Sequence, residues 1–193
     1  MKKLLRPLVL VVAVVALAAC PSTRLVETWK DPATQQLRFH KVLTVAIFKD
    51  PTLRQTVEDD LARRIPGATP SYRVLAEGDL QDVAAAKAKV AAQDFDGAVV
   101  MRVANRENKM SYVPGPGVNT FWGYYGSGWP TVYNPGYLVE DDIVTVETAV
   151  YDIGRDKLVW SGHSESTNPS SVASLVDGIV KSVAKEMKRQ KLI

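Results

Sequence analysis

Cysteine and histidine are scarce in this chain of 193 residues. Cys20 is the only cysteine, and the histidines are His40 and His163. A single thiol excludes an intrachain disulfide and any metal site built from several cysteines. A zinc site would need both histidines together with carboxylates, and no spacing in the sequence favours that combination. We therefore expect no metal and no other cofactor.

An excess of charge of one sign is also absent once the first few residues are set aside. The chain has 24 Lys and Arg residues against 21 Asp and Glu residues, and Lys2, Lys3 and Arg6 account for the difference. The rest of the chain is formally neutral, so it offers no broad surface that could neutralise phosphates. We therefore expect no nucleic-acid partner.

No apolar run is long enough to cross a membrane as a helix. The longest, residues 8–19, has twelve residues, whereas a spanning helix needs about 20. A basic start, a short apolar run and small residues before a cleavage point are typical of a secretory signal. The ending Leu17-Ala18-Ala19-Cys20 resembles the lipobox of bacterial lipoproteins. The resemblance implies a signal peptide at residues 1–19, lipidation of Cys20 and attachment to a membrane through that residue.

These features predict a location in the bacterial cell envelope, with the protein lipid-anchored and facing the periplasm. Pro21 follows the lipidated position where an Asp would resemble an inner-membrane retention signal. This favours the outer membrane. Residues 20–40 are then a lipid-anchored tether that includes a first strand at 25–30, because Val26 and Trp29 favour burial.

The remaining residues, 41–193, are sufficient for a single domain. Residues 41–48 are apolar and β-branched, as in a strand buried on both faces. After Asp50 and Pro51, apolar residues four apart predict a helix that ends before Pro66-Gly67, with Glu58 on its solvent side. The last helix follows Asn168-Pro169 and has the clearest apolar face in the chain. The other predicted elements are strands at 72–75, 98–104, 142–153 and 158–166 and a helix at 80–94.

This succession predicts the α/β class, with a mixed sheet, the order β-α-β-α-β-β-β-α, and helices packed on the sheet.

One segment, residues 113–137, does not fit the alternation of strands and helices. Its 25 residues include no charged side chain, six Gly, four Pro and seven of the chain's 15 aromatic residues. Three interpretations stay open. The rings cover a face of the sheet, they form an exposed patch for a protein partner, or they contact glycans or lipid headgroups. The candidate partner-binding residues are Phe121, Trp122, Tyr124, Tyr125, Trp129 and Tyr133.

A catalytic interpretation centres on Ser161, His163 and Glu165, which alternate along one predicted strand. Residues two apart on a strand are about 6.6 Å apart, too far for a nucleophile to bond its base. No Gly-x-Ser-x-Gly sequence is present to expose the serine. We therefore interpret the three residues as the polar face of a hairpin strand and expect no enzymatic activity.

The final third of the chain resembles uncharacterised bacterial lipoproteins that carry domains of unknown function. The resemblance rests on residues 144–148, Tyr151-Asp152, residues 158–162 and residues 164–169. The β-α-β-α-β opening is similar to the N-terminal domain of TolB and to lipoprotein activators of penicillin-binding proteins. These likenesses imply a binding, assembly or regulatory module with an envelope protein or a peptidoglycan-associated partner. The alternative is a membrane-anchored hydrolase or glycan-binding module.

Overall fold

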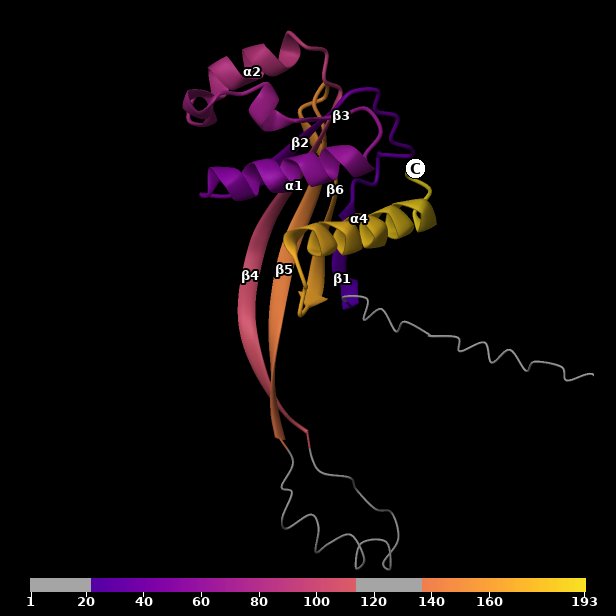
Figure 1. The fold of residues 1–193 in the computed structure, drawn as a ribbon. Helices are drawn as coiled ribbons and strands as arrows, with labels where there is room; N and C mark the ends of the chain where they lie inside the picture. The colour runs from indigo at the N-terminus through magenta and orange to yellow at the C-terminus, as the bar shows by residue number, and fades with distance from the viewer. Residues whose placement is uncertain (1–21, 114–136) are drawn as a thin grey trace, which may run out of the picture.

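The computed structural model describes residues 22–113 and 137–193. In this part of the chain, six strands form one mixed sheet in the order β1-β6-β5-β4-β2-β3 (Figure 1). β1, β6, β5 and β4 are antiparallel neighbours, while β4, β2 and β3 are parallel. The strands are β1 (Ser22–Lys30), β2 (Val42–Ile47), β3 (Ala68–Pro70), β4 (Gly97–Val113), β5 (Tyr137–Asp152) and β6 (Lys157–Thr167).

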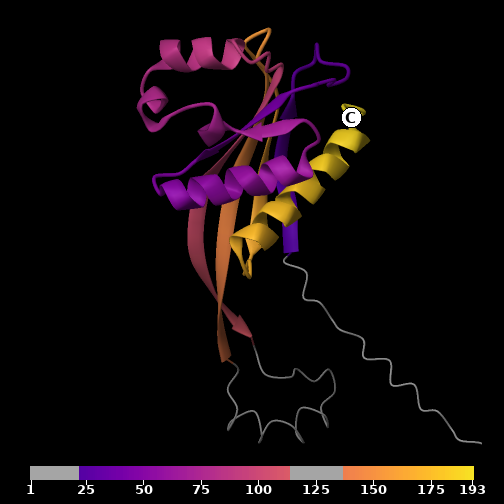
Figure 2. The same ribbon diagram turned by 45° about the horizontal axis from the view of Figure 1, so that its top comes forward.

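Two helices cover one face of this sheet. α1 (Pro51–Arg64) and α4 (Val172–Arg189) lie side by side on that face (Figures 1 and 2), which we call the helix face. α2 (Val83–Ala91) belongs to the opposite face, where its Val90 packs on Leu43, Phe95 and Ala98. We call that side the open face, because α2 is the only described α-helix on it and lies at its end near β2. The predicted α/β class, with helices packed on a mixed sheet, is confirmed.

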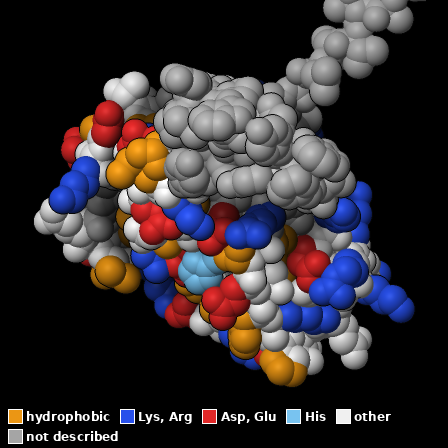
Figure 3. Space-filling model, turned by 90° about the horizontal axis from the view of Figure 1, so that it is seen from below, with side chains coloured by type: hydrophobic (Ala, Val, Ile, Leu, Met, Phe, Trp, Pro, Cys, Tyr) orange, Lys and Arg blue, Asp and Glu red, His pale blue; other side chains and the backbone are white. Residues whose placement is uncertain are grey.

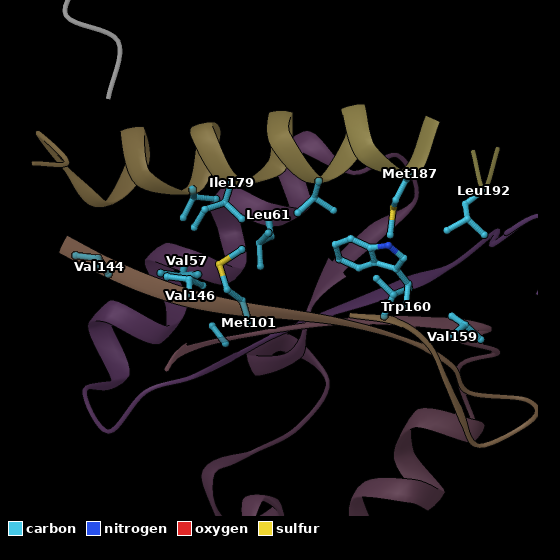
Figure 4. Packing of buried hydrophobic residues seen from close by; sticks show 14 residues of the cluster. Val57, Leu61, Met101, Val144, Val146, Val159, Trp160, Ile179, Met187 and Leu192 are labelled. Carbon is cyan, nitrogen blue, oxygen red and sulfur yellow. The ribbon is translucent and has the colours of Figure 1, made fainter. Parts of the chain in front are cut away.

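The helix face contains the main core. Trp160 of β6 is fully buried and lies beneath α4, close to Met187 (Figure 4). α1 contributes Val57 and Leu61, which are buried as the four-residue spacing predicts. The N-terminus of α1 is capped by Asp50, whose carboxylate accepts hydrogen bonds from the backbone N–H groups of Thr52 (2.8 Å) and Leu53 (3.2 Å).

Glu58 is also buried, although the sequence pattern places it on the solvent side of α1. Its side chain is fully shielded from solvent. The carboxylate accepts hydrogen bonds from the backbone of Ala46 (3.1 Å) and Tyr72 (2.9 Å), from the Ser71 hydroxyl (2.7 Å) and from Arg54 Nε (2.9 Å). One carboxylate therefore joins α1, the end of β2 and the turn that follows β3.

Several predicted boundaries differ from the structure. The strand predicted at 72–75 is wrong: β3 ends at Pro70, and the residues that follow form a 3₁₀ turn, η1 (Ser71–Arg73). A second 3₁₀ turn, η2 (Glu77–Leu80), precedes α2, which begins only after its cap, Asp82. α4 begins after Ser171. Several polar residues that could serve as a cap precede each of these two helices. The last of them supplies the cap, Asp82 for α2 and Ser171 for α4.

The prediction that β1 is a strand is correct, but the stated reason is wrong. Val26 is 46% exposed and Trp29 is 45% exposed. Trp29 pairs with Ser161 across the edge of the sheet, and Val26 lies where the pairing register shifts between Leu25 and Glu27. Pairing with β6, rather than burial of these two side chains, fixes β1.

Candidate functional site: the open face and the β4–β5 arm

β4 and β5 extend beyond all the strands beside them. β2 ends at Ile47, which pairs with Arg102 of β4. β6 ends at Thr167, which pairs with Ile143 of β5. Residues 108–113 of β4 and 137–142 of β5, which pair with each other, therefore continue as a ribbon of two strands, which we call the arm. It projects well past α1 and α4 (Figure 1). The predicted strands at 98–104 and 142–153 are too short to include the arm.

Charged and polar side chains pair where the arm begins, around residues 106–108 and 140–142, which we call its stem. Arg106 donates two hydrogen bonds to the Asp142 carboxylate, at 3.0 and 2.8 Å. The Asn108 amide donates to Glu140 Oε1 at 2.8 Å. Arg106 lowers the pKa of Asp142 below its usual value, because the guanidinium stabilises the carboxylate. The stem therefore carries full charges in the neutral pH range.

The distal end of the arm carries large apolar side chains in solvent. Met110 is 70% exposed, Tyr137 is 64% exposed and Leu138 is 66% exposed. Apolar groups gathered at the end of a projecting ribbon are unusual on a surface without a partner. The predicted partner-binding aromatics, Phe121 to Tyr133, belong to the residues that join β4 to β5. They lie outside the described residues, as does Cys20.

The open face carries a row of charges across four strands. Arg102 of β4, Glu147 of β5, His163 of β6 and Glu27 of β1 stand opposite one another in the strand register. Arg102 and Glu147 form an ion pair. His163 lies between two carboxylates, with Nδ1 3.7 Å from Glu27 and Nε2 4.0 Å from Glu147. Figure 3, a view from below, shows a histidine with acidic and basic side chains around it.

This arrangement bears on the catalytic interpretation of β6. Ser161, His163 and Glu165 share one face, as the alternation predicts. Within the described ranges, no hydrogen bond joins any two of the three, and Glu165 pairs instead with Arg24 at 2.8 Å. The carboxylates near His163 come from neighbouring strands, so a search along the sequence of β6 misses both of them.

An apolar cleft of about 430 Å³ opens on the other side of the sheet, between α1, α4 and the strands. Leu61, Ile179 and Val183 are among its lining residues, together with Thr148 and Val150 of β5. Thr148 and His163 lie on opposite faces of the sheet, so this cleft does not lead to the charged row. No group of three or more metal-binding side chains occurs in residues 22–113 and 137–193. Over the same ranges, no helix has the length and apolar character required to cross a membrane.

β1 is held firmly from its first residues. The Thr23 and Ser166 hydroxyls are 2.5 Å apart, and Ser182 of α4 donates to the Thr23 carbonyl at 3.3 Å. Gly178 of α4 packs so closely on Thr23 that a Cβ at position 178 would collide with it. At the other end of β1, Lys157 bonds Asp31 at 2.8 Å, and this bond lowers the pKa of Asp31. The sheet therefore includes the chain from Ser22 onward.

Comparisons with known proteins show distant likenesses only. No protein-family model matches the chain, and no curated protein matches it. A PelC dodecamer from Paraburkholderia phytofirmans is 14% identical, with 89% of this chain and 99% of that chain covered and a TM-score of 0.42. The lipoprotein GNA1162 from Neisseria meningitidis is 14% identical, with 77% and 98% covered and a TM-score of 0.37.

Proposed function

We propose that this chain is a lipid-anchored protein of the bacterial cell envelope whose α/β domain binds a macromolecular partner at the membrane surface. The position of β1 carries the proposal. β1 begins at Ser22, so only Pro21 separates the sheet from Cys20. One residue spans about 3.5 Å. An acylated Cys20 would therefore hold the whole sheet against the membrane, without a long tether.

The anchor and the arm belong to the same end of the sheet. Ser22 pairs with Thr167, and Thr167 pairs with Ile143, beyond which the arm begins. Six further residues of β5 extend the arm by about 20 Å past this level. The paired charges of the stem are costly to place in hydrocarbon. The anchored arm would therefore run along the membrane surface, where its apolar end can contact a partner.

The chemistry of the site supports binding rather than catalysis. The apolar cleft and His163 are on opposite faces of the sheet, so substrate binding and a titratable group do not converge. Exposed Met110, Tyr137 and Leu138 instead resemble the apolar centre of a protein interface. The residues between them in sequence add aromatic side chains and no charge. We infer a non-catalytic assembly or regulatory role with an envelope protein or a peptidoglycan-associated partner, with the outer membrane favoured by Pro21.

Anchoring is tested by replacing the lipobox cysteine. We expect wild-type cells fed a clickable fatty acid to label this protein, and Cys20→Ser to abolish the label. Intact mass should show wild-type protein that lacks residues 1–19, and Cys20→Ser protein that retains them. Thr23→Ser is the matched control, because it leaves the lipobox intact and keeps the hydroxyl that contacts Ser166; it should label normally. Wild-type protein with Met1 and a free thiol would refute the anchor.

Partner binding is tested by photocrosslinking from the arm. A photoreactive residue in place of Leu138 should give a discrete crosslinked species in intact cells, because this side chain is exposed at the distal end of the arm. Val83 on α2 is 79% exposed and provides a matched site far from the arm. The species should be absent when Val83 carries the probe. Identical products from both sites, or none from Leu138, would contradict an arm-directed partner.

A further inference from the structure

From residue 103 to residue 113, the outer edge of β4 has no neighbouring strand among the described residues. Arg102 is the last residue of β4 that pairs with β2, and among the described residues no strand lies beside residues 103–113 on that side. The backbone N–H and C=O groups that point outward there can pair with another strand. A bulge between Val103 and Asn105 marks the beginning of the regular part of this edge.

Two charged residues lie on this edge. Glu107 and Lys109 are exposed and share the open face. Neither forms an ion pair with any described residue. By contrast, Arg106 of β4 forms an ion pair with Asp142 of β5. Asp141, which faces Lys109 in the register, accepts a hydrogen bond from Asn168 at 2.7 Å instead.

We propose that a second copy of this chain pairs with this edge, β4 against β4 in the antiparallel sense, with Asn108 on the two-fold axis. This register places Glu107 of each copy directly opposite Lys109 of the other copy, twice in the symmetric pair. Opposite charges in directly opposed positions stabilise antiparallel strands. Asn105 then faces Ser111, so the pairing extends over residues 105–111, from the bulge nearly to the end of β4.

The charges also select this register over its neighbours. A shift of two residues in one direction places Glu107 opposite itself, and the same shift in the other direction places Lys109 opposite itself. Like charges directly opposed destabilise a strand pair. The resulting interface is isologous, as expected for a two-fold dimer. The two arms point in opposite directions, so both copies can be anchored to one membrane when the strands run along its surface.

A cysteine on the axis tests the register in the full-length protein. Asn108→Cys should form a disulfide-linked dimer under mild oxidation, because directly opposed Cβ atoms are about 4.5–5.5 Å apart. Leu138→Cys, on the other strand of the arm, should give much less dimer. Wild-type protein under the same oxidation shows any crosslink that forms through Cys20. The dimer test is therefore independent of the anchoring proposal. No dimer from Asn108→Cys, or as much dimer from Leu138→Cys, would overturn the register.

Charge exchange tests the same pairing without cysteine chemistry. By analytical ultracentrifugation of the full-length protein, Glu107→Lys and Lys109→Glu should each raise the dimer dissociation constant at least roughly tenfold. Combining the two changes should restore it to near the wild-type value. Both residues are exposed, and circular dichroism should show unchanged folding. Monomeric wild-type protein at all concentrations, or a double variant as weak as the single ones, would refute the proposal.

Discussion

Glu58→Ala should lower the free energy of unfolding by about 3–5 kcal/mol, the range for breaking a buried ion pair. The substitution removes four hydrogen bonds and leaves Arg54 partly buried, 11% exposed, without its carboxylate partner. It also leaves the backbone N–H groups of Ala46 and Tyr72 without an acceptor. Unsatisfied buried donors keep their full desolvation cost. A domain has about 5–15 kcal/mol of stability in total, so much of the fold's margin depends on this carboxylate.

Urea denaturation of the full chain measures this effect. Glu77→Ala is the matched control, because Glu77 is exposed and makes no ion pair within the described residues. It should change stability by no more than about 0.5 kcal/mol. Glu58→Gln keeps part of the hydrogen bonding, so its free energy of unfolding should fall between those of Glu58→Ala and Glu77→Ala. Equal midpoints for Glu58→Ala and Glu77→Ala would show that the carboxylate does not join α1 to β2 and η1.

Glu58 illustrates what a sequence pattern can and cannot predict. The apolar spacing predicts α1 correctly because Val57 and Leu61 depend only on helical periodicity. The pattern assigns Glu58 to solvent because charged residues are rarely buried. Its burial depends on four groups from other segments, brought together only by the folded chain. A local pattern contains no signal for such a cluster.

The arm escapes prediction for a related reason. Residues 105–109 include three charged and two Asn side chains, which a propensity argument assigns to a loop. In the structure these residues form β strand because β5 pairs with them residue by residue. The end of the predicted strand at 104 coincides with the bulge between Val103 and Asn105. Beyond the bulge, the side chains of residues 105–110 of β4 are exposed on both faces, so hydrophobic alternation disappears although the strand continues.

The charged row on the open face likewise could not be predicted in full from local sequence. The alternation of Ser161, His163 and Glu165 correctly predicts one shared face. The neighbours of His163 depend on the register of β6 against β1 and β5, and both pairings contain a shift. Glu27 and Glu147 are far from His163 in sequence. Their approach could be inferred only after the register was known.

Trp160→Ala should destabilise the fold by about 3–5 kcal/mol, the usual cost of removing a buried aromatic ring. Trp160 is fully buried between β6 and α4, and the ring also packs on Gly162. For a domain of this size, such a loss should lower Tm by roughly 6–20 °C. The indole N–H has no hydrogen-bond partner in the described part of the chain. The loss should therefore come from packing and not from polar bonding.

Two further variants test whether the stability lost in Trp160→Ala comes from packing. One tests the contribution of the indole N–H, and the other tests the loss of a tryptophan at an exposed position. Trp160→Phe removes the unpartnered N–H and only part of the ring volume, so it should cost about 1–2 kcal/mol. Trp29→Ala removes the same side chain from a half-exposed position on the open face, and should cost about 1 kcal/mol or less. Thermal and urea unfolding should rank the three variants in that order. A loss from Trp160→Phe as large as that from Trp160→Ala would show that the indole N–H has a bonding partner, because packing alone cannot make the smaller truncation equally costly.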